Sequence, residues 1–253
     1  MRKHISVLGL WIRCSLYKIL GILAIMSIVE YMLFYFTLNN ELSVYEITGT
    51  FSRPEALIDR SGIFLCFATA FIVITVLLSI YGCQFGSKTS YTLQRLSINE
   101  KYVFLYQSVY NSFVYILFWS AQTVLCILML KNYTSQAPTE FIGEQSVLLA
   151  FYRSTRLHPL LPFSDIMLWA RNIILLIALS LGAAEFPYIQ RRGKKSVTVI
   201  ALALYTVVLW KQDISPLGSL ISCILIAIAV LVSVSYQLFA KEETEDGNKD
   251  ISY

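Results

Sequence analysis

The stretch SGIFLCFATAFIVITVLLSIYG, residues 61–82, contains no charged side chain. A helix needs roughly 20 mostly apolar residues to cross the ~30 Å hydrocarbon core of a bilayer, and unpaired backbone groups are not tolerated there. The stretch therefore predicts a membrane-spanning helix. Five further segments have the same character, so we expect an all-α integral membrane protein with six transmembrane helices. These segments are residues 15–38, 102–130, 166–187, 196–211 and 214–240.

Composition agrees with a membrane protein. The chain has 253 residues, of which 57% are hydrophobic and 14% charged, and its mean hydropathy is +0.63. Such a chain is too apolar for an ordinary soluble domain. We interpret residues 1–240 as one transmembrane domain, because no polar stretch is long enough for a separate soluble domain. The tail, residues 241–253, is polar and acid-rich, which predicts a disordered cytoplasmic segment.

The distribution of basic residues predicts the orientation. If the N-terminus is cytoplasmic, 13 of the 20 Lys and Arg residues fall inside, six fall outside, and Arg171 lies within a span. The positive-inside rule therefore predicts that both termini lie in the cytoplasm. The densest basic run, QRRGKK at 190–195, follows span four. Beside a span, such a run indicates topology rather than binding of nucleic acid.

Two further patterns concern the N-terminus and the cysteines. The first 18 residues, MRKHISVLGLWIRCSLYK, mix apolar and basic residues, which predicts a separate amphipathic helix lying in the inner interface. The five cysteines form no CxxC pair and lie in or beside spans. We interpret them as small apolar side chains rather than as a disulfide framework or metal site. His4 and His158 are predicted on opposite sides of the membrane, so they cannot share a metal.

Two connections predicted outside differ greatly in length. Residues 131–165 form the longer one, with an amphipathic stretch at about 143–152 that predicts a short helix. Spans five and six are separated only by Lys211-Gln212-Asp213, which predicts a tight hairpin. Asn132-Tyr133-Thr134 is a glycosylation sequon, a short pattern that matters only in a cell that glycosylates.

The segment between spans two and three contains GSKTSYTLQRLSINE, residues 86–100. A Walker phosphate loop needs Gly-Lys followed directly by Ser or Thr, whereas Ser87 separates Gly86 from Lys88, so nucleotide binding by this chain is rejected. Capped by Thr89 or Ser90, the segment instead predicts a short cytoplasmic helix. Its apolar side chains suit the groove of a partner protein, and the alternative is a helix lying on lipid headgroups.

This segment, in its place between spans two and three, resembles the coupling helix of ABC-2 type transporter permeases. The resemblance covers the whole chain in topology but only residues 86–100 in motif. It implies a separate ABC ATPase, which holds the ATP and Mg, and a second permease subunit, the same or homologous. This chain would then carry no cofactor and would not be an enzyme. The residues implied to contact the ATPase are Tyr91, Thr92, Leu93, Arg95 and Leu96.

The implied function is the permease subunit of an ATP-driven exporter in a bacterial cell membrane. The cargo implied is amphipathic, such as a peptide, an antibiotic or a lipid-like molecule. The chain departs from the family in one respect. Family members often carry re-entrant helical elements between spans five and six, where this chain has only a few residues. The form of the extracellular gate is therefore left open.

Placing a charged side chain inside a membrane span costs free energy, and such side chains often have a function. Glu30 lies in the outer half of span one, and Arg171 lies just below the outer end of span four. Their similar depths motivate the hypothesis of an ion pair that stabilises one state of the pathway. The alternative is that Arg171 extends to the outer headgroups while Glu30 faces a wet cavity. Glu185, near Arg191 and Arg192, is interpreted as an anchor at the inner interface.

Three rival functions are weighed. A membrane enzyme would need clustered catalytic groups at one depth, and the sequence shows no HExxH motif or paired carboxylates on one span. A non-transporting scaffold or sensor could use the same cytoplasmic helix to hold a partner, and the sequence does not separate it from a permease. A carrier driven by protons or sodium is disfavoured, because the spans hold few acidic residues.

Overall fold

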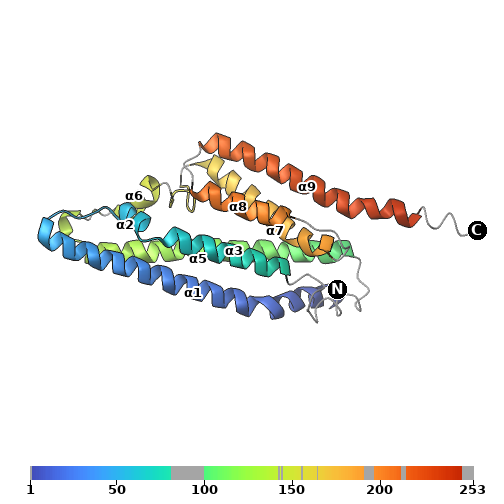
Figure 1. Cartoon of the computed structure of the whole chain (residues 1–253), viewed down its shortest axis with the longest axis horizontal. Coiled ribbons are helices and arrows are strands. Elements are labelled where there is room, and N and C mark those ends of the chain that lie inside the picture. Colours follow the sequence, from blue (N-terminus) through green and yellow to red (C-terminus); the bar gives the residue numbers. More distant parts are fainter. Residues whose placement is uncertain are drawn as a thin grey trace, which may run out of the picture.

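The computed structural model describes residues 2–80, 100–141, 143, 145–154, 156–163, 165–190, 197–211 and 215–246. All regular secondary structure in this part of the chain is helical, and it contains no strand (Figure 1). Its helices are α1 (Arg2–Thr48), α2 (Pro54–Arg60), α3 (Ile63–Ile80), α5 (Glu100–Gln136), η1 (Thr139–Phe141), α6 (Ser146–Arg153), α7 (Ile166–Gln190), α8 (Thr198–Lys211) and α9 (Pro216–Asp246).

The longer helices run up and down along one common direction (Figure 1). The short elements α2 and α6 lie together at one end of the bundle, which we name the capped end. The first residues of α1 and the last residues of α9 lie at the opposite end, which we name the terminal end. In the sequence prediction, the capped end is the outer end and the terminal end is the cytoplasmic one.

Within the described residues, five helices are long and apolar enough to cross a membrane, so the chain is a multi-pass membrane protein. They are α1, α3, α5, α7 and α9. The sixth predicted span, residues 196–211, corresponds to α8, which has only 14 residues. At 1.5 Å per residue it is about 21 Å long, less than the ~30 Å hydrocarbon core. The chain around α8 is polar, with the basic run at 191–195 before it and Lys211-Gln212-Asp213 after it.

Helix α1 differs from its prediction at both ends. The predicted interfacial helix, residues 1–18, is not a separate element, because α1 is continuous from Arg2 to Thr48. No proline or polar turn interrupts this stretch, so nothing ends the helix. Residues 39–48 lie beyond the predicted span 15–38 but extend α1, because Leu42 and Tyr45 pack against the core of the capped end. Gly49, with φ of 67°, then ends the helix.

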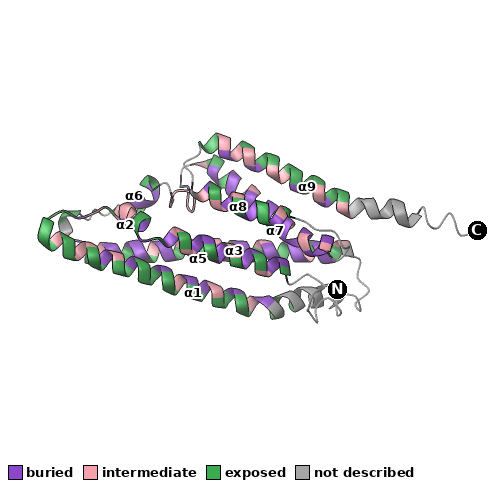
Figure 2. Cartoon of the chain, viewed as in Figure 1, coloured by how far each residue is buried: buried purple, intermediate pink, exposed green. Residues whose placement is uncertain are grey.

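The apolar core has two parts. The larger cluster is formed by side chains of α1, α3, α5, α7, α8 and α9, with α7 packed against α3, α5, α8 and α9. The smaller cluster fills the capped end, where Phe51 and Phe151 pack with Leu57 and Met129. Helices α1 and α9 flank the bundle on opposite sides and expose apolar faces (Figure 2). In a bilayer, such faces meet lipid or another membrane protein.

Several predictions concern other parts of the chain. The residues implied to contact an ATPase, between 91 and 96, lie outside the described residues, as does the basic run at 191–195. The predicted amphipathic helix at about 143–152 is present as α6. The predicted disordered tail begins too early, because α9 continues to Asp246. Lys and Glu are good helix formers, so a long apolar helix extends into them at little cost.

Candidate functional site

Three charged side chains are buried within the bundle. Glu30 of α1 and Glu185 of α7 are each 0% exposed, and Arg171 of α7 is 4% exposed. Buried charges in membrane-spanning helices are costly, and they mark functional sites more often than structural ones. Each of the three is held by different neighbours, which the following paragraphs describe in turn.

Glu30 faces helix α5. Its Oε2 accepts a hydrogen bond of 2.8 Å from the Nε2 of Gln122. The same Nε2 lies 3.8 Å from the Sγ of Cys126, one turn further along α5. Glu30 Oε1 and Gln122 Oε1 are also buried, but neither has a hydrogen-bond partner among the described residues. Two acceptor oxygens therefore lie unsatisfied in one dry contact between α1 and α5.

Arg171 is held from its own helix rather than by an acid. Its Nε and Nη2 donate to the Oδ1 of the adjacent Asn172, at 3.3 and 3.0 Å. Asn172 in turn donates through Nδ2 to the carbonyl of Pro159, at 2.7 Å. The pair thus fastens α7 to the segment 156–163, which passes over the capped end.

The hypothesised ion pair between Glu30 and Arg171 is absent from this structure. No ion pair joins them in the described part of the chain, and each binds the partner named above. Helix α5 explains the separation, because it packs against both α1 and α7, which carry the two residues. Arg171 is 4% exposed within the bundle, and the alternative, that it extends to the outer headgroups, stays a prediction.

Glu185 lies near the terminal end, between α7 and α9. Its Oε1 accepts a hydrogen bond from the hydroxyl of Ser233, and Thr198 at the start of α8 also interacts with the carboxylate. The predicted partners Arg191 and Arg192 lie outside the described residues. Glu185 therefore joins three helices in the interior, and it is not exposed as an interface anchor would be.

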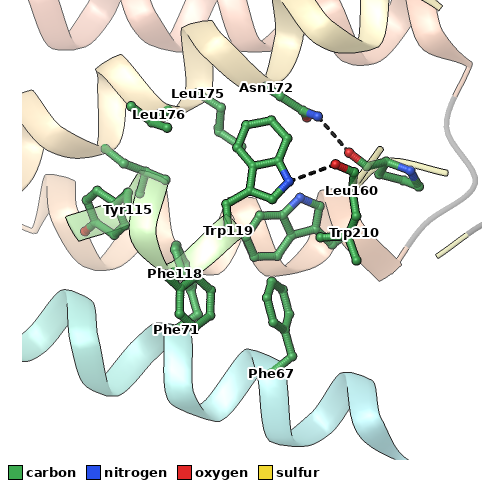
Figure 3. Close-up of a pocket in the computed structure, with 12 residues that line it drawn as sticks. Phe67, Phe71, Tyr115, Phe118, Trp119, Leu160, Asn172, Leu175, Leu176 and Trp210 are labelled. Atoms are coloured by element: carbon green, nitrogen blue, oxygen red, sulfur yellow. Dashed lines mark hydrogen bonds between the residues drawn. The ribbon is translucent and has the colours of Figure 1, made fainter. Parts of the chain in front are cut away.

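An aromatic cavity is lined by side chains of α3, α5, α7 and α8, with Asn172 in its wall (Figure 3). The indole Nε1 of Trp119 donates to the carbonyl of Leu160 at 2.9 Å, which closes the cavity from the capped end. Phe67 lies between Phe118 and Trp210, with ring centroids 4.9 and 4.7 Å away. The cavity measures about 40 Å³, whereas sites for drug-sized ligands measure roughly 300–1,000 Å³. In this conformation it holds a water-sized molecule and no larger cargo.

A second small cavity adjoins the first and leads toward Glu30. It shares Phe67 and Trp210 with the aromatic cavity, and its wall includes Gln122 and Cys126. Arg156 lines the same cavity, and its Nε lies 3.2 Å from an oxygen of Asp59. The polar contact of Glu30 is thereby connected, through Gln122, to a cavity near the capped end.

The role of Gln122 was missed from sequence, although a signal was present. Gln107, Asn111 and Gln122 are spaced by four and eleven residues in span three, so they share one helical face. All three are buried. Asn111 donates to the carbonyl of Ser180 on α7 at 3.3 Å. A polar stripe in an otherwise apolar span therefore identifies the face of α5 that packs against its neighbours.

Comparison with known proteins identifies no relative: no family model, no curated protein sequence and no solved structure matches the chain. Among the described residues, no group of three or more His, Cys, Asp or Glu side chains is placed to hold a metal ion.

Proposed function

We propose that this chain is the permease subunit of an ATP-driven exporter of the ABC-2 type, located in the plasma membrane with both termini in the cytoplasm. It would work with a second permease, the same or homologous, and with separate ABC ATPase subunits that bind ATP and Mg. The chain itself would not be an enzyme. The amphipathic cargo would be a peptide, an antibiotic or a lipid-like molecule.

One observation carries this proposal. Helix α3 ends at Ile80 and helix α5 begins at Glu100, both at the terminal end of the bundle, where α1 begins and α9 ends (Figure 1). The segment 81–99 with the coupling-helix motif is therefore tethered at the end that charge predicts to be cytoplasmic. A cytoplasmic ATPase would meet the permease at this end.

The internal cavities favour a pathway between two permeases over one through a single chain. The aromatic cavity of about 40 Å³ is too small for an amphipathic cargo, and a larger apolar cavity of about 280 Å³, lined by α3, α7 and α8, is still below the roughly 300 Å³ of the smallest ligand sites. By contrast, α9 exposes Ile221, Leu225, Ile228 and Val232 along one helical face. α1 likewise exposes apolar side chains on the opposite flank. A cargo with apolar surface would slide along such faces at lower desolvation cost than through the closed interior.

The test is a pull-down from detergent of the full chain, co-expressed with the ABC ATPase encoded beside its gene. The variant is Leu93→Asp/Leu96→Asp, which places charges on the predicted docking surface. The matched control is Ser87→Asp/Ser97→Asp, which adds the same charge at polar positions of the same segment. We expect the wild type and the control to retain the ATPase. The Leu93/Leu96 variant should co-purify with at least tenfold less ATPase than the wild type does.

Gel filtration and thermal melting of each variant show whether the permease stays folded. If the wild type binds no ATPase, or if the Leu93/Leu96 variant binds it as well as the control does, the proposal is wrong. The scaffold or sensor alternative is separated by a second readout in proteoliposomes. A permease should make ATP turnover by the bound ATPase depend on an amphipathic cargo, whereas a scaffold should leave turnover unchanged.

A further inference from the structure

If Glu30 is an ionised carboxylate, its contact with the amide of Gln122 leaves hydrogen-bond acceptors without donors. An ionised carboxylate only accepts hydrogen bonds, and so does the amide oxygen. With Glu30 ionised, one hydrogen bond forms at 2.8 Å, and Glu30 Oε1 and Gln122 Oε1 both remain unsatisfied at a fully buried position. Each buried acceptor without a donor carries a desolvation cost, and a buried carboxylate without a counter-charge carries a larger one.

A single proton on Glu30 would remove the buried charge and supply the donor that this contact lacks. Placed on Glu30 Oε1, it converts that oxygen into a donor, and the unsatisfied acceptor on the neighbouring side chain is Gln122 Oε1. The carboxylic acid and the amide can then each donate and accept. The opposite orientation of the amide leads to the same result. It would place two oxygens 2.8 Å apart, a contact that only a proton on Glu30 makes favourable.

A metal cation is a poorer occupant than a proton. The contact offers two free oxygens, Glu30 Oε1 and Gln122 Oε1, whereas hard cations such as Ca²⁺ and Mg²⁺ take six or more oxygen ligands. The nearest additional side chain is the thiol of Cys126, a soft ligand. We propose that Glu30 is a proton-binding site that, when protonated, locks α1 onto α5 through Gln122. This inference goes beyond the exporter assignment and does not depend on it.

Among the described residues, no ion pair joins Glu30 to a charged side chain. α3 presents Cys66 to it and α5 presents Cys126, both thiols. α2, which packs on the later part of α1, carries Glu55, Asp59 and Arg60 nearer the capped end. Of these, Arg60 lies 3.9 Å from Glu41, and Asp59 pairs with Arg156. Protonation of Glu30 is therefore governed by its burial and by Gln122.

The proton links pH to helix packing. Releasing it leaves a buried carboxylate beside an unsatisfied amide oxygen, which favours separation of α1 from α5 and access of water. The cavity lined by Gln122 and Arg156 adjoins this contact on the side of the capped end. The α1–α5 contact is thus expected to tighten in acid and to loosen as pH rises.

The experiment uses the full chain in lipid nanodiscs, as wild type, Glu30→Gln and Glu185→Gln. Infrared difference spectra between neutral and alkaline pH detect the C=O stretch of a protonated carboxylic acid. We expect this band in the wild type at neutral pH, its disappearance in Glu30→Gln, and its retention in Glu185→Gln. Glutamine is isosteric with protonated Glu30, so Glu30→Gln should also keep the Tm of the wild type at neutral pH.

The pH dependence of melting provides a second readout. As pH rises through the transition seen in the infrared spectra, the Tm of the wild type should fall by roughly 3–6 °C, the size expected for one buried hydrogen bond. The Tm of Glu30→Gln should not follow this fall. The proposal is overturned if the band is absent at neutral pH, if it persists in Glu30→Gln, or if Glu30→Gln melts well below the wild type or does not fold.

Discussion

Glu30 and Glu185 are both fully buried carboxyl groups, yet the two ends of the bundle hold them differently. Glu30, toward the capped end, has a single hydrogen-bond partner among the described residues, the amide of Gln122 on a facing helix. Glu185, toward the terminal end, has hydroxyl neighbours from two helices, Ser233 of α9 and Thr198 of α8, although its Oε2, like Glu30 Oε1, has no hydrogen-bond partner among the described residues. A buried carboxyl group with one partner loses all its hydrogen bonds when that partner is removed, whereas a group with two partners keeps one of them. The capped half should therefore be more sensitive to single polar substitutions.

The largest effect is expected from Gln122→Leu. This change removes the one partner of Glu30 and leaves its carboxyl group buried and unsatisfied, at a cost of about 2–3 kcal/mol in the free energy of unfolding. Tm in detergent should fall by roughly 5–10 °C. The matched control is Gln107→Leu on the same helix, because the Nε2 of Gln107 already has no partner among the described residues. Equal losses in the two variants would show that the Glu30 contact contributes nothing special.

A second substitution tests whether the position of Arg171 also depends on one hydrogen-bond partner. Asn172→Leu removes both the acceptor for the Arg171 guanidinium and the donor to the carbonyl of Pro159. We expect a loss of about 2 kcal/mol in the free energy of unfolding and faster hydrogen exchange in residues 156–161. The control is Ser180→Ala on the same helix, whose hydroxyl bonds only to the nearby carbonyl of Ile177. Unchanged exchange in residues 156–161 would contradict the proposed fastening.

These sites show what sequence reveals about a helical membrane protein. Hydropathy predicted a helix at each of the six apolar segments, because length and composition are properties of one segment. It also found Glu30 and Arg171, because a charge in an apolar run is conspicuous. It did not predict their neighbours, because depth along the membrane normal says nothing about which helices are adjacent. Helix α5 packs between α1 and α7, and this arrangement excluded the predicted pair.

Other differences have local physical causes. The N-terminal segment belongs to α1, which is one helix of 47 residues. Basic residues among apolar ones change whether a helix contacts water or lipid, but they do not end the helix. Residues 39–48 are polar enough to read as a loop, but Leu42 and Tyr45 bury against the capped end. Tertiary packing outweighed composition there. The polar stripe on α5 was the one signal in the sequence that could have identified Gln122 in advance.

A smaller effect is expected at the aromatic cavity. Trp119→Phe removes the hydrogen bond from the indole to the carbonyl of Leu160, 2.9 Å long, at a cost of about 1 kcal/mol. Hydrogen exchange at residues 157–161 should rise. Trp210→Phe is the control, since it shortens a ring packed on Phe67 and Phe71 without breaking that bond. If both variants raise exchange equally, ring packing rather than the hydrogen bond holds the segment in place.

The smallest effect is expected from Ser233→Ala at the terminal end. The variant removes one hydrogen bond to Glu185 but leaves Thr198 beside the carboxylate, so the free energy of unfolding should fall by only about 0.5 kcal/mol. Ser233→Ala/Thr198→Val removes both neighbours and should cost more than the sum of the two single changes, because each hydroxyl compensates for loss of the other. Melting of the three variants measures this coupling. A single Ser233→Ala loss as large as that of Gln122→Leu would mean that Glu185 depends on one partner, as Glu30 does, and the contrast between the two ends would disappear.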